Sequence, residues 1–315
     1  MSGPTPRSLE PELLNPYSAF PHTTRRVFLQ TCGALAAAPW AARAVADTAA
    51  APLQLPLHLT QLVNHIGISV TDVTKSATFY SHLFDGSKIS GQEKPSLRYI
   101  INFYPGAMSV GDLRGAAGGA QTQPLIDHFC VAAEPYDPAA WRARLDQEGF
   151  RYFAGGSFVN IDSIPVQLVG GRRSAAPRRP PPAGGGGGFM PMPPLYTGQP
   201  LVKAHGFEHV MLHVSDLDAS TAAFRKLFGL VPHKSGASEV FFSVGAVRLG
   251  LRKAADGEKS SIASYAIKVA KFDRSRVSDG LEALGAKVEP AAARERRTVL
   301  RFADPDGIKC ELWAA

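Results

Sequence analysis

The chain has 315 residues, of which 45% are hydrophobic and 19% charged, so it is long enough for two domains and too apolar for a disordered protein. Its net charge of +7 is concentrated in residues 1–46, with four Arg against two Glu, and in residues 171–200, with four Arg and no acid. The rest of the chain is nearly neutral. This distribution excludes a basic groove that neutralises many phosphates, so no nucleic-acid partner is expected.

Residues 1–46 have the pattern of a bacterial export signal. Arg25 and Arg26 precede a mildly apolar, alanine-rich stretch, and the small residues Ala44–Ala46 follow it. The pattern resembles a twin-arginine signal peptide, which implies a periplasmic or otherwise exported mature protein. No other run of about twenty apolar residues occurs, so no membrane span is expected after signal removal.

The chain has three cysteines, at 32, 130 and 310. None belongs to a C-x-x-C pair, which excludes thiolate zinc sites and thioredoxin chemistry. Cys130 and Cys310 stand in strand-like apolar runs and are predicted to be small buried side chains.

The body of the chain is a tandem duplication. Val63–Val70 recurs as Phe207–Val214 at an offset of 144 residues, and the same offset relates Tyr80 to Phe224. The comparison predicts a first module at 57–170, a linker rich in Pro, Gly and Arg at 171–200, and a second module at 201–315.

Each module divides again into two units of the same order. His65–Val70 alternates as a strand, Asp72–Phe84 has helical spacing, and Arg98–Tyr104 reads as a further strand. The order restarts at Asp127–Ala132, before a helix capped by Asp137. The predicted fold class is therefore α+β, with tandem βαβββ units that form two modules.

These residues resemble the vicinal oxygen chelate (VOC) superfamily, also called the glyoxalase/bleomycin resistance/dioxygenase family. The resemblance rests on His65–Asp72, on Phe79–Phe84, on the segment from His209 to Phe228 and on the closing Phe302–Leu312 with its Asp-Pro-Asp-Gly turn. It covers roughly 60–170 and 203–315. It implies two glyoxalase-like modules, but a fold shared by lyases, isomerases, dioxygenases and metal-free binders does not decide the function.

The resemblance also implies where a metal would be held. The expected ligands are an imidazole on the first strand of each unit and a carboxylate on the closing strand. The first module offers His65, His128 and Gln167 at these places. The second offers His209 and Glu311, with Ser264 in place of the second imidazole, so its site is expected to be degenerate.

The first module has three donors but no anion. A divalent metal is expected there (Fe2+, Zn2+, Mn2+ or Ni2+), with Asp112 as the one nearby acid of note. Small residues at 67, 69, 130 and 132 leave room for a ligand beside the histidines. Glu208, one residue from His209, is predicted to point away from that face.

Two functions follow. One is an exported metal-dependent lyase, isomerase or ring-cleaving dioxygenase that acts on a small molecule with vicinal oxygens, with the metal as Lewis acid. The alternative is a non-catalytic protein that binds and sequesters a small molecule, as bleomycin-resistance proteins do. Metal content discriminates between them. No oligomeric state follows from the sequence.

Overall fold

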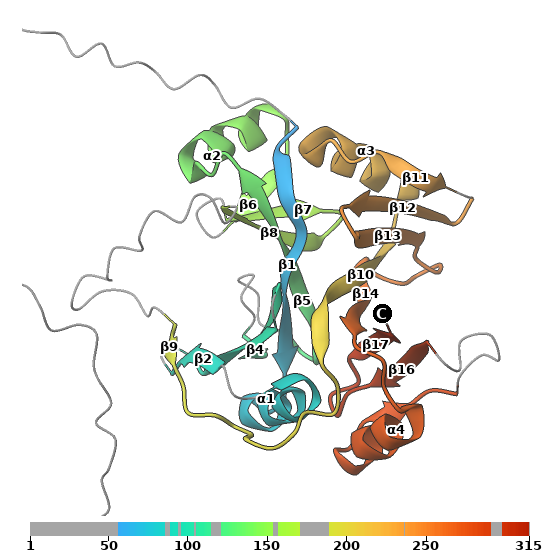
Figure 1. Cartoon of the computed structure of the whole chain (residues 1–315). Coiled ribbons are helices and arrows are strands. Elements are labelled where there is room, and N and C mark those ends of the chain that lie inside the picture. Colours follow the sequence, from blue (N-terminus) through green and yellow to red (C-terminus); the bar gives the residue numbers. More distant parts are fainter. Residues whose placement is uncertain are drawn as a thin grey trace, which may run out of the picture. The chain divides into compact units, whose positions relative to one another are not determined.

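The computed structural model describes residues 56–85, 89–93, 96–103, 105–114, 121–153, 157–170, 189–235, 237–290 and 298–314 (Figure 1). The predicted export signal and the linker residues 171–188 lie outside this part. Within it, no helix is both long enough and apolar enough to cross a membrane.

The first module contains two βαβββ units in one sheet. Its first unit comprises β1 (His58–Val70), α1 (Val73–Tyr80), the π-helical turn η1 (Ser81–Asp85), β2 (Ile89–Gln92), β3 (Arg98–Phe103) and β4 (Gly106–Asp112). Its second unit comprises β5 (Leu125–Glu134), α2 (Pro138–Gln147), β6 (Arg151–Phe153), β7 (Phe158–Ile161) and β8 (Ile164–Gly170). In the described residues the sheet runs β6-β7-β8-β5-β1-β4-β3-β2-β9, where β9 is Met190–Pro191.

The second module repeats this plan. Its units comprise β10 (Ala204–Val214), α3 (Leu217–Phe228), β11 (Pro232–Ser235), β12 (Glu239–Val244) and β13 (Val247–Lys253), then β14 (Ser261–Val269), α4 (Arg274–Ala283), β15 (Lys287–Val288), β16 (Val299–Ala303) and β17 (Lys309–Ala314). Its described strands run β11-β12-β13-β10-β14-β17-β16-β15. The prediction of two α+β modules built from βαβββ units is confirmed.

The helices begin where the sequence predicts. The Asp72 side chain accepts from Lys75 N at the start of α1, and the Asp137 side chain caps α2, with Pro138 in its first turn. These caps bond backbone N–H groups that have no partner within the helix.

Two faces of the first sheet differ in chemistry. On β1, Ile66, Ile68 and Val70 are at most 1% exposed and join the core, as strand alternation requires. The other face carries His65, which pairs across β5 with Cys130 and from there with Gln167 on β8. Here this is called the histidine face.

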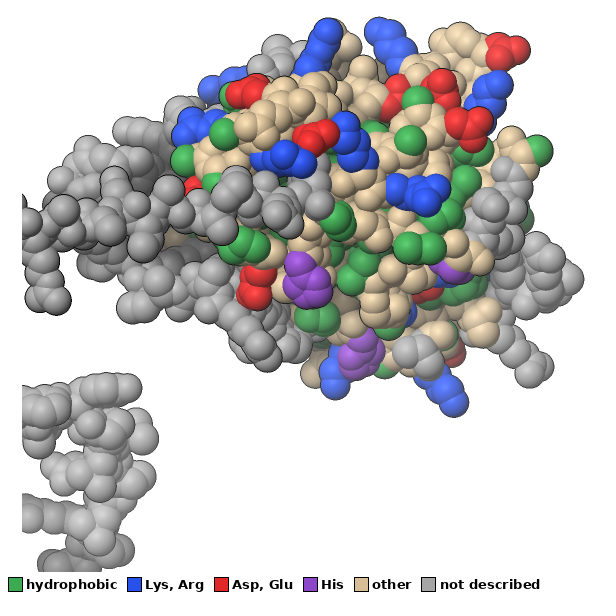
Figure 2. Space-filling view, turned by 90° about the horizontal axis from the view of Figure 1, so that it is seen from above, with side chains coloured by type: hydrophobic (Ala, Val, Ile, Leu, Met, Phe, Trp, Pro, Cys, Tyr) green, Lys and Arg blue, Asp and Glu red, His purple; other side chains and the backbone are tan. Residues whose placement is uncertain are grey.

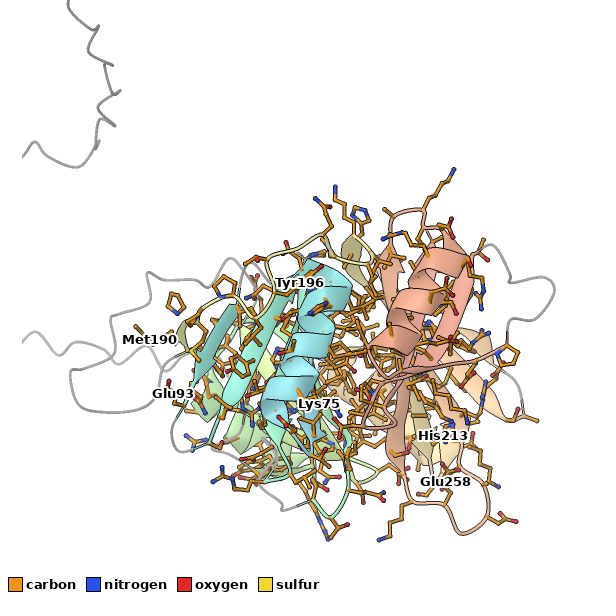
Figure 3. All side chains as sticks on the ribbon, turned by 90° about the horizontal axis from the view of Figure 1, so that it is seen from below. Lys75, Glu93, Met190, Tyr196, His213 and Glu258 are labelled. Atoms are coloured by element: carbon orange, nitrogen blue, oxygen red, sulfur yellow. The ribbon has the colours of Figure 1, made fainter. Side chains whose placement is uncertain are left out.

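Residues 189–200 are attached to the first module. Strand β9 pairs with β2, and the ring of Tyr196, which is labelled in Figure 3, stacks on the His82 ring with centroids 3.7 Å apart. Leu201 N and Val202 N donate to the carbonyl oxygens of His82 and Leu83. The end of the predicted linker therefore forms an edge of the first sheet, which the Pro/Gly-rich composition did not indicate.

The modules are joined by two equivalent aspartates. Asp306 Oδ1 accepts from Thr71 N (3.2 Å) and Oγ1 (2.5 Å), while its Oδ2 accepts from Ser76 Oγ (2.6 Å). In return, Asp162 accepts from Ser215 N and Oγ, both at 2.6 Å. Asp162 and Asp306 stand 144 residues apart, like Thr71 and Ser215, so each module binds the residue that precedes the cap of the first helix of the other.

We expect Asp306→Ala and Asp162→Ala each to lower the free energy of unfolding by about 2 kcal/mol, because each removes several hydrogen bonds to a carboxylate. That corresponds to a fall in Tm of about 4–8 °C, measured by differential scanning calorimetry. Asp279→Ala on α4 is the control, since this exposed aspartate has no hydrogen bond or ion pair with any described residue. An unchanged Tm for Asp306→Ala would show that the hydrogen bonds of Asp306 between the modules do not stabilise the fold.

Candidate functional site

Two predicted ligands of the first module meet on the histidine face. His65 Nε2 and His128 Nε2 are 3.3 Å apart, and the rings stand edge to face. His128 is 1% exposed. Burial, followed by the nearness of His128, lowers the pKa of His65 to about 3, so this ring is neutral at pH 7.

A chain of amides determines the tautomer of His65. Gln61 Nε2 donates to the carbonyl oxygens of Val63 (3.1 Å) and Pro105 (2.8 Å), which only accept. Gln61 Oε1 therefore accepts from Asn64 Nδ2 (2.9 Å), and Asn64 Oδ1 faces His65 Nδ1 (3.2 Å). Because that amide oxygen also only accepts, His65 Nδ1 carries the proton and Nε2 carries a lone pair.

Asp127 does the same for His128. Its Oδ2 lies 2.8 Å from His128 Nδ1, and both side chains are at most 3% exposed. A carboxylate accepts, so Nδ1 of His128 carries a proton, and the neutral form of this ring has its lone pair on Nε2. In the neutral form of both rings the two lone pairs face each other, an arrangement that a shared cation would stabilise.

The separation suits one metal ion. Bonds of about 2.0–2.1 Å from zinc to histidine nitrogen, at a tetrahedral angle, hold two nitrogens about 3.4 Å apart. Gln167 supplies a further feature: its Oε1 is buried and has no hydrogen-bond partner among the described residues. The Gln167 side chain also acts to raise the pKa of His65, against the effect of burial, so the amide faces that ring.

Glycine at position 67 makes room for the second histidine. Gly67 pairs with His128 across β1 and β5, and a Cβ at Gly67 would stand 2.0 Å from His128 Cε1. The imidazole therefore occupies the volume that any other side chain would need. Cys130, between His65 and Gln167, is buried, and burial raises the pKa of its thiol, so it stays protonated.

The other acid considered for this site lies elsewhere. Asp112, at the end of β4, bonds the Arg114 side chain and backbone. Among the described residues, no three His, Cys, Asp or Glu side chains gather as a metal cluster. The candidate site is thus two imidazoles and an amide, with Asp127 behind His128.

In the second module, His209 has a different surrounding. Glu208 Oε2 bonds His209 Nδ1, and Glu208 Oε1 accepts from Arg248 Nε (3.0 Å) and Nη2 (2.7 Å). Although burial acts to raise it, these bonds lower the pKa of Glu208. Glu208 therefore does not point away from this face as predicted. The register shift between Phe207 and His209 is a bulge, which turns the extra residue toward its neighbour.

Glu311 is bound by other side chains. Its Oε1 lies 3.3 Å from Arg301 Nε, and its Oε2 accepts from Trp313 Nε1 (2.8 Å). The Trp313 ring also packs edge-on against His209, with centroids 5.7 Å apart. No hydrogen bond or ion pair joins His209 to Glu311 in the described part of the chain, and both residues contact Trp313.

In the second module, other side chains fill the space that a second histidine would need. Met211 stands at the place of Gly67 and Ser264 at the place of His128. A Cβ on Gly250 would be 2.6 Å from Met211 Cε and 3.0 Å from Phe241 Cε1, so these two side chains fill the face.

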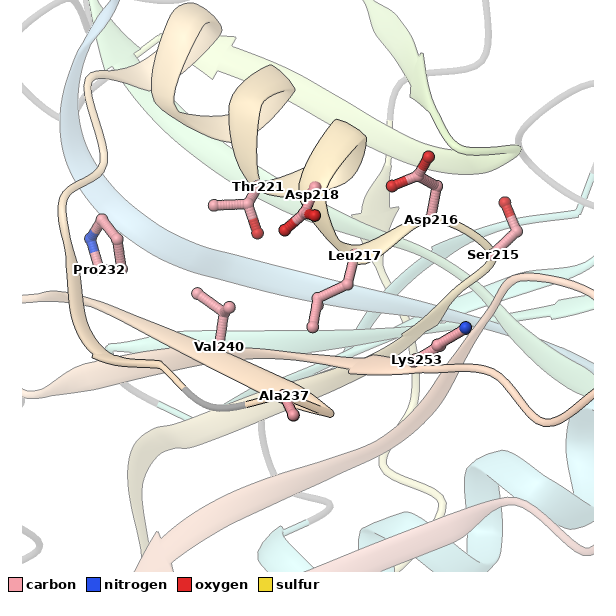
Figure 4. A pocket seen from close by; sticks show the side chains of 9 residues that line it. All are labelled: Ser215, Asp216, Leu217, Asp218, Thr221, Pro232, Ala237, Val240 and Lys253. Carbon is pink, nitrogen blue, oxygen red and sulfur yellow. The ribbon is translucent and has the colours of Figure 1, made fainter.

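A cavity of about 730 Å³ lies beside α3 in the second module, and Figure 4 shows the side chains that line it. It shares no residue with either histidine cluster, and Asp216 in its wall is already the cap of α3. Figure 2 shows charges of both signs interspersed over the visible face of the described residues. His213, far from the histidine pair in sequence, bonds Glu258 at 2.8 Å (Figure 3).

Three residues of the site were missed: Asn64, Asp127 and Glu208. Each directly precedes a candidate histidine and accepts from its Nδ1. The signal was present as the dipeptides Asn-His, Asp-His and Glu-His, but strand alternation places neighbours on opposite faces. Asp127, too, stands at a register shift, between Gly67–His128 and Ile68–Ile126.

No family model matches the chain. Solved structures do resemble it, among them a 2,3-dioxygenase from Pseudomonas sp. KL28 (12% identity, 82% of this chain and 93% of that chain, TM-score 0.56). Others are the Mn(II)-bound glyoxalase from Novosphingobium aromaticivorans (13%, 82% and 83%, 0.51) and a variant of homoprotocatechuate 2,3-dioxygenase from Brevibacterium fuscum (12%, 84% and 74%, 0.53). At this level of identity the likeness concerns the fold, and the chain has the two-module, glyoxalase-like fold of these VOC enzymes.

Proposed function

We propose that the chain is a metal-dependent enzyme of the glyoxalase and dioxygenase type, with its working site at the His65–His128 pair. The observation that carries the proposal is the pair of Nε2 atoms 3.3 Å apart, with an acceptor oxygen at the Nδ1 of each ring. Such outer hydrogen bonds orient metal-binding histidines and raise their basicity.

His65 and His128 would hold the ion, and the buried Oε1 of Gln167 would complete the set. Imidazole and amide donors suit Fe2+, Zn2+, Mn2+ or Ni2+. A bound divalent metal supplies Lewis acidity to a substrate that chelates it through two adjacent oxygens. Asp127 fixes the His128 tautomer and brings negative charge next to a ligand set that is otherwise neutral.

The reaction class follows the fold's relatives: ring cleavage of a vicinal diol, or a lyase or isomerase reaction. The test is the metal content of the purified protein by plasma mass spectrometry, expected at one divalent ion per chain. Metal-loaded protein is then supplied with catechols and with adducts of 2-oxoaldehydes and thiols. Metal-free protein after anaerobic reconstitution would contradict the proposal. Bound ligand without product would assign the sequestering function instead.

We also propose that the protein is exported through the twin-arginine route. Replacement of Arg25 and Arg26 by Lys should trap the precursor in the cytoplasm, because that route requires the arginine pair. Cell fractionation followed by immunoblotting measures the processed and unprocessed forms. Changing Arg7 to Lys, outside the motif, is the matched control. Normal processing of the double variant would exclude this export route.

A further inference from the structure

One cationic side chain of the histidine face is not used by the proposed metal site. Arg98 on β3 pairs with Gly111 of β4, and a Cβ at Gly111 would be 2.9 Å from Arg98 Nη2 and 3.1 Å from Cζ. Arg98 Nη1 donates to Ser109 Oγ at 3.1 Å, and Ser109 is 3% exposed. The guanidinium therefore lies directly over the β4 backbone and is held toward Ser109.

That position is close to the histidine pair. Ser109 pairs with Gly67, whose other neighbour is His128. The His128 ring lies over Gly67 of β1 and the guanidinium over the neighbouring β4, and neighbouring strands are about 4.8 Å apart, so the guanidinium lies about one strand spacing from that ring. Consistent with this, Arg98 contributes to the lowered pKa of His65.

Most of the Arg98 donors are available to a ligand. A guanidinium has five N–H donors, and among the described residues its one hydrogen-bond acceptor is Ser109. No described carboxylate lies within ion-pair distance: Asp112 is bonded to Arg114 and Asp127 to His128. Burial lowers the pKa of Arg98 while Asp127 and Asp112 act to raise it, and the group remains a cation.

The charge on this face then favours an anion. Two neutral imidazoles and an amide add nothing to a divalent ion, and the Asp127 carboxylate balances only the Arg98 guanidinium. Building on the proposed metal site, we infer that Arg98 is the anion-binding residue of that site and that the substrate carries a carboxylate beside its vicinal oxygens. The planar guanidinium matches the two oxygens of a carboxylate.

The test compares two probes of nearly equal shape. Zinc-loaded protein is titrated calorimetrically with 3,4-dihydroxybenzoate and with the uncharged 3,4-dihydroxybenzamide. The wild type should bind the benzoate about ten- to hundredfold more tightly, as a charge-assisted hydrogen bond predicts. Arg98→Gln should remove this preference and leave the affinity for the benzamide within about threefold. Arg114→Gln, an exposed arginine of the same module, should change neither affinity.

The outcomes separate this inference from the metal proposal. A wild type that binds zinc but does not prefer the benzoate overturns the inference alone, as does an Arg98→Gln protein that loses both probes equally. If zinc does not bind, the metal proposal fails, and metal-free protein is titrated with benzoate while the Arg98 Nε–Hε NMR signal is followed. A saturable shift of that signal supports Arg98 as the carboxylate site. No shift, or tighter binding of inorganic phosphate than of benzoate, overturns it.

Discussion

Purified protein in which His65 is replaced by Ala should contain no stoichiometric divalent metal, whereas His209→Ala should keep the wild-type content. His65 contributes one of two facing Nε2 atoms, so its loss leaves His128 and an amide, too few donors to hold the ion. His209 instead lies between Glu208 and Trp313, and its module has Ser264 where the second imidazole would be.

Two further variants should change the metal affinity by smaller amounts and in opposite directions. Asp127→Asn keeps the size of the side chain and removes the charge, and should weaken metal affinity by about 10–100-fold. Gln167→Glu should tighten binding, because it places an anion among neutral donors. Dissociation constants come from competition with a chromophoric chelator, and circular dichroism confirms that each variant is folded. Metal that survives His65→Ala but not His209→Ala would make the second module the working one.

The fold was predictable because its information is local and repeated. The offset of 144 residues, the alternation at His65–Val70, the helical spacing from Asp72 and the cap Asp137 specify the order of elements, and the structure keeps it. β9 was not predictable, since Met190–Pro191 has no pattern of its own and pairs with β2 through tertiary context.

For the site, the sequence predicted which histidine pair meets but not what surrounds it. His65 and His128 come from strands that pair in register, which alternation can place. Bulges determine the side-chain directions of Asn64, Asp127 and Glu208, and the periodicity of the residues does not reveal a bulge. Whether Glu311 is available to a metal depends on which side chains compete for its carboxylate. Arg301 and Trp313 bind its two oxygens, and no rule of sequence spacing predicts those contacts.

Gly67 offers the sharpest test of why only one module would bind metal. In the first module the strand partner of His128 is glycine, and in the second the corresponding pair is Met211 and Ser264. In the first module the larger side chain of the pair is His128 on β5, and in the second it is Met211 on β10. The two modules therefore fill the corresponding volume from different strands. A site with two imidazoles requires glycine on the first strand.

Gly67→Ala should therefore abolish stoichiometric metal binding while the protein stays folded. The new Cβ would stand 2.0 Å from His128 Cε1, and the buried ring can escape only by leaving its bond with Asp127. Overpacking of this kind lowers the free energy of unfolding by about 1–3 kcal/mol. Metal content and Tm are measured together, and a Gly67→Ala protein with full metal content would show that the ring has other room.

Gly250→Ala in the second module is the matched control. Its Cβ would also be too close to a neighbour, at 2.6 Å from Met211 Cε, but that atom is the free end of an unbranched side chain. Methionine adapts to such crowding, so the free energy of unfolding should fall by under about 1 kcal/mol. Metal content should not change, because Met211 belongs to the second module, whereas His65 and His128 belong to the first. If both alanines removed the metal equally, the loss would reflect general destabilisation, and the space that Gly67 leaves for His128 would not be its cause.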